Sequence, residues 1–501
     1  MASDTIAIPE EHGIETHGIE RVSPQTRTHV RIFDNFTMWL SANLVISTIA
    51  LGVLAKEVFL LGFWDGLAVI LLFNALGVLS PAILSTLGPL LGLRQMTISR
   101  FSFGWIGASI MSLFNIAACI GWSAVNVIVG GQLVVALACG NAVPAACTAS
   151  VLGISMSGSV LEGLGILLIA LLTTLVSIYG YRYVHYYERF AWIPMAIIFV
   201  VLGVIAGQHF SISAFPGWTG AEIAAMISFG GAIYGFATGW SSYAADYNVN
   251  QPENTRPSRI FWLTALGIFI PCVLLETLGM SLASWNSSLP GGQLLAFAVS
   301  PLGVFGKILV FLLALSVIAN NIPNDYSLGL TVQVLGRPLQ RVPRYVWTLI
   351  GAVVYVVIAL FVASNFNATL ESFLLLVAYW LGPWAIITIL EHFVIRKGRY
   401  NINDWNTAER LPAGWAALVA MAAGLFGVFL GFAQTWIIND TFTPITGVIG
   451  GLVNPPTGMD VGFELGVVFA LVVYMILRPI ELRASPTRTF GSPALSAQET
   501  A

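Results

Sequence analysis

The sequence predicts an all-α membrane protein that crosses the bilayer many times. Of its 501 residues, 57% are hydrophobic and only 9% are charged, whereas soluble domains carry about 25% charged residues. The mean hydropathy is +0.84. A run of about 20 apolar residues spans a bilayer as a helix, and the chain contains many such runs. The net charge of −3 gives no reason to expect a nucleic-acid partner.

Twelve apolar segments are predicted to be the membrane-spanning helices, numbered 1 to 12 in chain order. Their approximate bounds are Phe36–Lys56, Trp64–Leu84, Ile110–Ala138, Val160–Tyr179, Phe190–Ala206, Ile223–Ala245, Arg259–Ser284, Leu302–Asn321, Tyr345–Ala363, Leu370–Val394, Gly414–Ala433 and Gly462–Leu477. We therefore expect a transmembrane domain at residues 36–480, between tails at residues 1–35 and 481–501.

The basic residues test this number of spans and orient them. If the N-terminus is cytoplasmic, 19 of the 21 Lys and Arg residues fall in the two tails and in alternate loops, and only Lys56 and Lys307 lie elsewhere. Cytoplasmic loops are enriched in Lys and Arg. Removing one span would place the later arginines outside. The pattern predicts twelve spans with both termini in the cytoplasm.

Segments 1 and 6 are predicted to be broken helices. Segment 6 has four glycines between residues 230 and 239, each of which destabilises a helix by about 1 kcal/mol; close packing through small residues is the alternative explanation. Segment 1 is a weaker case and is unusually polar, with Asn43, Ser47 and Thr48. Two broken helices five spans apart are typical of transporters with a five-plus-five inverted repeat.

Segments 3 and 8 carry paired polar side chains that indicate a binding site. Trp122 and Asn126 are four residues apart and share a helix face, where an indole and a carboxamide suit a flat heterocycle. Trp240 is placed to supply a second stacking face. Asn320 and Asn324 also share a face. The alternatives are a buried Trp with an Asn that joins two helices, and a helix 8 that ends at the membrane interface.

Two further features stay open at this point. Glu276 lies well inside segment 7, so it is a candidate proton site, although a structural hydrogen-bonded glutamate explains it equally well. Cys139 and Cys147 flank one predicted outer loop and either form a disulfide or remain unpaired. The six histidines lie in the tail or near helix ends, and no metal-binding or catalytic motif accompanies them, which argues against an intramembrane enzyme.

Several stretches together resemble the nucleobase–cation symporter-1 family, in its purine–cytosine permease branch. They are Gly18-Ile19-Glu20-Arg21-Val22, Trp39-Leu40-Ser41-Ala42-Asn43, Gly92-Leu93-Arg94-Gln95-Met96, Ser99-Arg100-Phe101, Gly121-Trp122-Ser123-Ala124-Val125-Asn126, Tyr243-Ala244-Ala245-Asp246-Tyr247, Asn320-Asn321-Ile322-Pro323-Asn324, Arg341-Val342-Pro343-Arg344 and Gly462-Phe463-Glu464-Leu465-Gly466. Each is weak alone, but together they extend from the tail to helix 12.

The resemblance implies a LeuT-like fold and cation-coupled uptake of a nucleobase by alternating access. By motif, the substrate-site positions of the family fall on Trp122, Asn126, Trp240, Asn320, Pro323 and Asn324, and less securely on Thr48. Cytosine and purines such as adenine, guanine and hypoxanthine are the expected substrates. The alternatives are another flat heterocycle, namely a B6 vitamer, a hydantoin or allantoin.

The helix 8 sequence favours a proton over sodium as the coupling ion. Sodium-coupled relatives resemble LeuT in placing helix 8 hydroxyls against helix 1 carbonyls, whereas here the stretch 315–319 offers only Ser316. A hard cation needs several oxygen ligands. We expect no cofactor and no bound metal, a protein that functions as a monomer, and a location in a bacterial inner membrane or a fungal plasma membrane.

Overall fold

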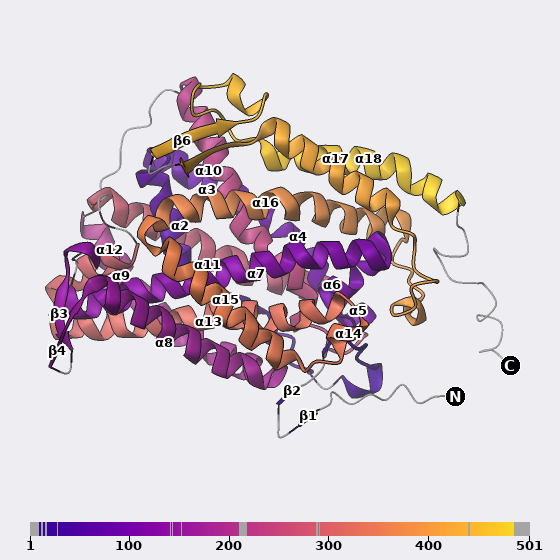
Figure 1. Cartoon of the computed structure of the whole chain (residues 1–501), viewed down its shortest axis with the longest axis horizontal. Helices are drawn as coiled ribbons and strands as arrows, with labels where there is room; N and C mark the ends of the chain where they lie inside the picture. The colour runs from indigo at the N-terminus through magenta and orange to yellow at the C-terminus, as the bar shows by residue number, and fades with distance from the viewer. Residues whose placement is uncertain are drawn as a thin grey trace.

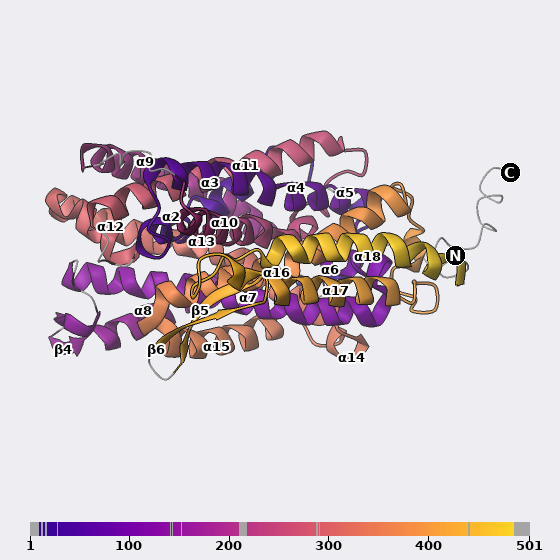
Figure 2. The same cartoon turned by 90° about the horizontal axis from the view of Figure 1, so that it is seen from above.

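A computed structural model describes residues 10–484 except 12–13, 16–17, 28, 141, 143, 152, 210–217, 287–288, 290 and 439–440. Long helices run along one common axis, which lies horizontally in Figures 1 and 2. Most of the predicted C-terminal tail, residues 485–501, lies outside the described part of the chain.

The twelve predicted spans appear as helices in the expected order. They are α1 (Asp34–Asn43) with α2 (Ile46–Glu57), α3 (Phe63–Gly77) with α4 (Leu79–Ser85) and α5 (Leu87–Leu91), α7 (Arg100–Cys139), α8 (Gly158–Tyr179), α9 (Tyr181–His209), α10 (Gly220–Gly239), α11 (Pro257–Trp285), α13 (Val304–Val334), α15 (Arg344–Val362), α16 (Phe366–Leu390), α17 (Trp415–Gly431) and α18 (Gly462–Ala484). Within the described residues, ten spans are long and apolar enough to cross a membrane, the bent α1–α2 pair makes an eleventh, and α17 is a shorter apolar helix.

Short elements connect these spans. They are α6 (Gln95–Ile98), α12 (Gly291–Val299), α14 (Arg337–Gln340), the 3-10 helix η3 (Trp240–Tyr247), the π-helical turn η6 (Glu391–Ile395), and three antiparallel strand pairs: β1 (Glu10–Glu11) with β2 (Ile14–Glu15), β3 (Thr148–Val151) with β4 (Ile154–Ser157), and β5 (Ala433–Ile438) with β6 (Thr441–Thr446). Ala433 is paired with Thr446 and Thr148 with Ser157.

Helix 1 is broken, as predicted. α1 ends at Asn43 and α2 begins at Ile46, and the two axes differ by 51°. The break lies at Leu44 and Val45, and Val45 has extended backbone angles of −140° and 164°. α2 packs tightly on α11, because a Cβ atom on Gly52 would lie 1.8 Å from the Glu276 carbonyl oxygen. Because Gly52 has no side chain, this half of helix 1 can pack directly against the backbone of α11.

Helix 6 is also discontinuous, but the discontinuity follows the glycines. α10 remains helical through Gly239, and the chain then narrows to the 3-10 helix η3, inside which Tyr243 has a non-helical φ of −141°. The glycines instead allow close packing: a Cβ on Gly230 would lie 2.5 Å from the Phe73 ring, and one on Gly235 would lie 2.3 Å from the Leu374 carbonyl oxygen. Tertiary contacts therefore offset their poor helix propensity.

The two ends of the bundle differ in chemistry. α5, α6 and α14 lie at one end, and β4 and α12 lie at the other (Figure 2). We name the first the basic end, since the buried arginines Arg94, Arg100, Arg344, Arg396 and Arg478 belong to it. Near the opposite end, Cys139 and Cys147 are joined by a disulfide with Cα atoms 6.0 Å apart. Of the two alternatives for these cysteines, the structure has the paired one.

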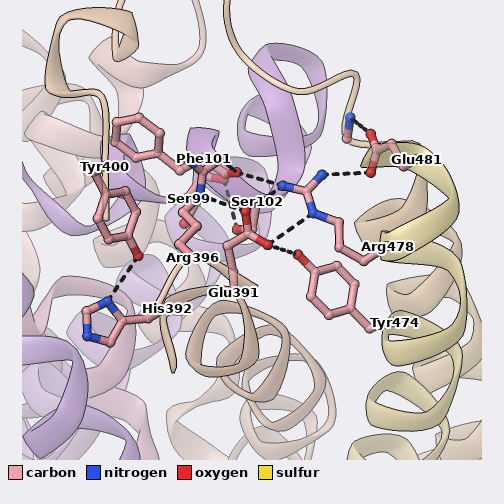
Figure 3. Close-up of polar contacts among 11 residues, drawn as sticks. Ser99, Phe101, Ser102, Glu391, His392, Arg396, Tyr400, Tyr474, Arg478 and Glu481 are labelled. Carbon is pink, nitrogen blue, oxygen red and sulfur yellow. Dashed lines mark hydrogen bonds and ion pairs between the residues drawn. The ribbon is translucent and has the colours of Figure 1, made fainter. Parts of the chain in front are cut away.

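Buried charges at the basic end are paired with one another. We name Glu391, Arg396, Tyr474, Arg478 and Glu481 the Glu391 cluster (Figure 3). The Glu391 carboxylate accepts hydrogen bonds from Arg396 at 2.7 Å, from Tyr474 at 2.7 Å and from Arg478 at 3.0 Å. Arg478 also donates to Glu481 at 2.8 Å. Each carboxylate therefore has guanidinium or amide donors, which burial of a charge requires.

The Glu391 cluster connects four parts of the chain. Arg396 and Arg478 both donate to the Phe101 carbonyl oxygen, at 2.9 and 3.3 Å. Glu481 accepts from the Gly414 amide at 2.6 Å, just before α17 begins. The cluster therefore joins the end of α16, the first turn of α7, the start of α17 and the last turns of α18.

Candidate functional site

A small cavity lies where α7, α10, η3 and α13 meet. Its lining residues are Trp122, Phe236, Gly239, Trp240, Tyr243, Asn320 and Asn324. Four of these seven were singled out from the sequence. The cavity has a volume of about 10 Å³, which is about the space that one water molecule needs. A heterocyclic ring therefore enters only when the surrounding side chains move apart.

Trp122 forms one wall of the cavity. Its ring lies edge-on to Phe236 and Phe373, with centroid distances of 5.3 and 5.0 Å. Gly239 faces the indole, since a Cβ there would lie 3.4 Å from Trp122 Nε1. The last residue of α10 thus presents only backbone to the ring. Aromatic neighbours fix the orientation of this wall, which is what a stacking surface needs.

Trp240 forms a second wall and is tied to the break in helix 1. Its indole N–H donates to Asn43 Oδ1 at 2.9 Å. Its ring also lies edge-on to Trp39 and Tyr243, at 5.3 and 5.6 Å. Asn43 is the last residue of α1, so the discontinuities of helices 1 and 6 meet at this hydrogen bond. A movement of α1 relative to α2 therefore reaches the cavity wall directly.

Asn126 lies behind the cavity and links three helices. Its Nδ2 donates to Asn320 Oδ1 at 2.6 Å, and its Oδ1 accepts from Ser47 at 2.6 Å. Asn320 in turn donates to the Ala42 carbonyl oxygen beside the break in helix 1. α7, α13 and both halves of helix 1 are thus connected by side-chain amides, and Asn126 is not among the residues that line the cavity.

Asn324 lines the cavity beside Tyr243. Tyr243 donates its hydroxyl to Asn324 Oδ1 at 2.8 Å, and Asn324 Nδ2 donates to the Asn320 carbonyl oxygen at 3.2 Å. Asn320 and Asn324 therefore do share one face of α13, as their spacing predicts. Because both amides are already hydrogen-bonded to protein, a ligand that binds them has to replace these bonds.

Thr48 and Pro323 are near the site but do not line the cavity. Thr48 donates its hydroxyl to the Asn43 carbonyl oxygen at 2.6 Å, across the break in helix 1. Pro323 lacks an N–H, so it cannot bond the carbonyl one turn earlier in α13, and its own carbonyl oxygen accepts from Tyr247 at 2.9 Å. In this arrangement both residues shape backbone around the cavity and do not face into it.

The lining favours an uncharged flat ring. None of the seven lining residues carries a charge, and burying a charged ligand without a partner is costly. Two indoles, a phenol and a phenyl ring offer stacking faces, and two carboxamides offer both donors and acceptors. This set of groups can hold a planar molecule whose edge has alternating donors and acceptors.

Three lining residues were missed by sequence reasoning. Phe236, Gly239 and Tyr243 belong to stretches that the sequence singled out, the glycine-rich part of helix 6 and the Tyr-Ala-Ala-Asp-Tyr stretch. Phe236 and Trp240 are four residues apart, and this spacing was the available signal. Without the 3-10 geometry of η3, the direction of Tyr243 was not predictable.

Glu276 lies outside this cavity, on α11. It is fully buried, and Asn74 of α3 donates to its Oε2 at 2.5 Å, while Oε1 has no hydrogen-bond partner among the described residues. Cys272, one turn earlier on α11, contacts Asn43 with its sulfur 3.7 Å from Oδ1. Contacts through Cys272 and Asn43 thus connect the turn of α11 that holds Glu276 with Trp240.

Known proteins resemble the chain over nearly its whole length. Residues 22–452 match the family model described as a permease for cytosine/purines, uracil, thiamine and allantoin. The purine-cytosine permease fcyB of Emericella nidulans is 40% identical, over 94% of this chain and 90% of its own. The purine-cytosine permease FCY2 of Saccharomyces cerevisiae is 38% identical, over 94% and 86%. The vitamin B6 transporter TPN1 of the same yeast is 28% identical, over 94% and 88%.

Solved transporters share the fold. Mhp1, a nucleobase-cation-symport-1 family transporter with bromovinylhydantoin bound, superposes with a TM-score of 0.68 at 17% identity, over 98% of this chain and 99% of its own. A Na+-coupled sialic acid symporter superposes with a TM-score of 0.56 at 12% identity, over 92% of each chain. These likenesses bear out the predicted LeuT-like fold. The chain belongs to the family of permeases for cytosine and purines, uracil, thiamine and allantoin, and it is a multi-pass membrane transporter and not an enzyme.

Proposed function

We propose that the protein is a proton-coupled importer of nucleobases, with cytosine and purines such as adenine, guanine and hypoxanthine as substrates. The observation that carries the proposal is the uncharged cavity between Trp122 and Trp240 at the meeting point of two broken helices. The most similar relatives named above are purine-cytosine permeases at 38–40% identity. Transport follows from rocking of one group of helices against the other around this site.

In the proposed complex the base lies between Trp122 and Trp240. The side chains of Asn324 and Asn320 form hydrogen bonds to the edge of the base directly. Asn126 forms one only after its own hydrogen bond to Asn320 has broken. Stacking on an aromatic side chain contributes about 1–3 kcal/mol per base, and a few hydrogen bonds of about 1 kcal/mol each bring the affinity to the micromolar range. Thr48 and Pro323 affect binding indirectly, because they set the backbone conformation of helix 1 and α13 around the cavity.

Another flat heterocycle is the second candidate substrate. The relative TPN1, which is 28% identical to this chain, is a vitamin B6 transporter. The structure of Mhp1, which is 17% identical, has bromovinylhydantoin bound. Both identities are well below those of the purine-cytosine permeases. Allantoin is a further candidate, because the family model includes it. The same aromatic walls would hold each of these rings, so only an uptake experiment with competing substrates distinguishes the candidates.

A proton is the proposed coupling ion, with sodium as the alternative. Ser316 is the one hydroxyl in the stretch 315–319 of α13, and it donates to the Leu313 carbonyl oxygen of its own helix at 2.7 Å. A hard cation needs several oxygens in one place, and the side chains of this stretch offer only the Ser316 hydroxyl. Glu276 is the proposed proton site, since it is buried near helix 1 and one of its carboxyl oxygens has no hydrogen-bond partner in the described part of the chain.

We propose that the basic end faces the cytoplasm, which puts both termini there. The support is the excess of Lys and Arg on that side. The membrane is then a bacterial inner membrane or a fungal plasma membrane, and one chain contains every group that the proposed site needs. The monomer is therefore the proposed functional unit.

An uptake panel tests the substrate. Cells lacking their own nucleobase permeases would express the protein and be given labelled cytosine or adenine, with unlabelled pyridoxine, allantoin or a hydantoin as competitors. Uptake of both bases, resistant to these competitors, is expected. Uptake blocked by pyridoxine or allantoin at equal concentration would assign the other heterocycle. Loss of uptake with a protonophore supports the proton, whereas uptake that survives it and requires sodium contradicts it.

A further inference from the structure

A second buried carboxyl group lies beside helix 1, on α9. Glu188 is fully buried, and neither of its carboxyl oxygens has a hydrogen-bond partner among the described residues. Ser41 of α1 is the hydrogen-bonding side chain that faces it, but no hydrogen bond of ordinary length joins the two groups among the described residues. A polar group this deeply buried normally has a partner. Glu188 is therefore an exception that the packing of the bundle alone does not explain.

A carboxyl group in such surroundings is stable only when it carries a proton. An ionised carboxylate taken out of water without donors or a positive partner costs far more than a protein can offset. The uncharged acid loses much less hydration free energy on burial, because its O–H group needs only one hydrogen-bond acceptor. These surroundings therefore favour the protonated form of Glu188 over the carboxylate.

Four ionisable groups of α1, α9 and the N-terminal tail at this corner have partners other than Glu188. Asp34 of α1 binds Arg189 of α9 and His29 of the N-terminal tail, the latter at 2.9 Å. His185 of α9 contacts the Tyr247 carbonyl oxygen at 3.1 Å. The charged residues of α8, α11 and α13, which also pack on α9, form no hydrogen bond or ion pair with Glu188; they are Glu162, Arg259, Glu276, Lys307 and Asp325. Within the described residues, none of these charged groups supplies the missing partner of Glu188.

Glu188 and Glu276 lie against different halves of helix 1. Glu188 faces Ser41 in α1, which begins at the basic end. The backbone of Glu276 touches Gly52 in α2, beyond the break. Between them, Asn43 at the end of α1 accepts the indole hydrogen bond of Trp240, a wall of the cavity. Each half of the broken helix therefore covers one buried carboxyl group, and the break itself contacts the proposed substrate site.

We propose that Glu188 is a second proton-carrying residue, from which the coupled proton leaves on the side of the basic end. When α1 separates from α9, water reaches the carboxyl group. The O–H bond then breaks, its electron pair stays on the carboxylate, and the proton passes to water. When α1 returns, the carboxylate is reburied only after it takes up a proton again. This inference rests on the proposed proton coupling and adds the residue that couples helix 1 to proton release.

The test compares Glu188→Gln with the unchanged protein in proteoliposomes that contain a pH-sensitive dye. Two quantities are measured: cytosine counterflow, which needs no net proton movement, and acidification of the lumen on addition of cytosine. The variant should keep counterflow within about twofold and lose most acidification and accumulation; one pH unit can otherwise drive about tenfold accumulation. Glu253→Gln, at an exposed loop position, is the matched control and should match the unchanged protein in both assays.

The outcomes separate this inference from the proposed function. If Glu188→Gln acidifies the lumen as the unchanged protein does, the inference is wrong while proton coupling stands. If the unchanged protein itself shows no cytosine-dependent acidification, proton coupling fails. Loss of counterflow in a stable Glu188→Gln protein would make the residue structural and overturn the inference. If that variant does not fold, Glu188→Asp decides: coupling with an altered pH dependence supports the inference, and an unaltered pH dependence contradicts it.

Discussion

The Asn126 side chain on α7 donates a hydrogen bond of 2.6 Å to the Asn320 side chain on α13. The same Asn126 accepts a bond of 2.6 Å from Ser47 of α2. One carboxamide thus joins two long helices of the bundle to the broken helix. Since Asn320 lines the cavity, any ligand that displaces its bond to Asn126 also loosens the contact with helix 1.

Replacing Asn126 by Ala is expected to impair transport more than folding. The change leaves Asn320 Oδ1 and the Ser47 hydroxyl without their partner, at about 1–3 kcal/mol for each buried group. The KM for cytosine should therefore rise at least about tenfold at normal surface abundance. Asn115→Ala is the matched control, since Asn115 lies on the same helix and donates to Thr331 at 2.8 Å. That variant should lose thermal stability and keep its KM. Equal KM changes in the two variants would contradict the site.

Trp122→Ala is expected to weaken binding through loss of a stacking wall. Stacking is worth about 1–3 kcal/mol per base, which corresponds to a loss of about 5- to 150-fold in affinity. Binding of labelled cytosine to the purified variant measures this loss directly. Trp262→Ala is the control, because Trp262 is 60% exposed on α11. Unchanged cytosine affinity in Trp122→Ala protein that melts normally would exclude stacking on this residue.

Gly239→Ala is expected to favour small bases over large ones. The added Cβ would lie 3.4 Å from the Trp122 indole nitrogen and narrow the space between α10 and α7. One methyl group in a tight pocket changes selectivity by about 1–3 kcal/mol. Adenine uptake should therefore fall about tenfold or more relative to cytosine uptake. A variant that lowers the uptake of both bases by the same factor would place the ring elsewhere.

Glu391→Gln is expected to destabilise the protein without altering its selectivity. The change removes the charge that Arg396 and Arg478 share (Figure 3). Removing one partner of a buried ion pair costs about 3–5 kcal/mol. The midpoint of thermal unfolding in detergent should fall, while the ratio of adenine to cytosine uptake stays constant. Glu409→Gln, at an exposed position, should leave the midpoint unchanged, and a Glu391 variant that melts like it would contradict the assignment.

Asp460 should make stability depend on pH. It lies between α17 and α18, and burial raises its pKa to about 6, although bonds from the Ala433 amide, the Tyr379 hydroxyl and the Gly462 amide oppose the rise. A carboxyl whose folded pKa is raised stabilises the fold at low pH, and this stability is lost as the pH rises from about 4 through 6.

The rise in the pKa of Asp460 determines how strongly stability depends on pH. A rise of about two pKa units corresponds to about 3 kcal/mol. Thermal unfolding between pH 4 and 7 should therefore show a decline in stability for the unchanged protein that is largely absent in Asp460→Asn. Comparing the two slopes removes the contribution of every titratable group that the two proteins share. Equal slopes would show that Asp460 does not titrate in this range.

Much of the fold was predictable because the bilayer restricts it. Hydropathy located the twelve helices. The polar residues of segment 1 indicated that it is broken, and the structure places the break at Leu44 and Val45. The discontinuity of helix 6 was predicted within the glycines, but it lies after them, at Trp240. The glycines are held helical by contacts with Phe73 and Leu374 on other helices. Such contacts between distant segments cannot be read from local propensity.

The candidate site was predictable where helical spacing determines direction. Asn320 and Asn324 share a face because they are four residues apart. Tyr243 was not predictable, because η3 departs from α-helical geometry at that residue. Glu188 was missed for a different reason. Nothing in the sequence distinguishes it from an interfacial acid, and the packing of α1 and other helices on α9 buries it.

A structure determined with cytosine bound tests the central claim most directly. We predict the base between the indoles of Trp122 and Trp240, with its hydrogen-bonding edge within about 3 Å of the Asn324 and Asn320 side chains. The cavity should be enlarged from about 10 Å³ by separation of α10 and η3 from α7 and α13. Cytosine located away from these indoles, with the cavity still closed, would contradict the account.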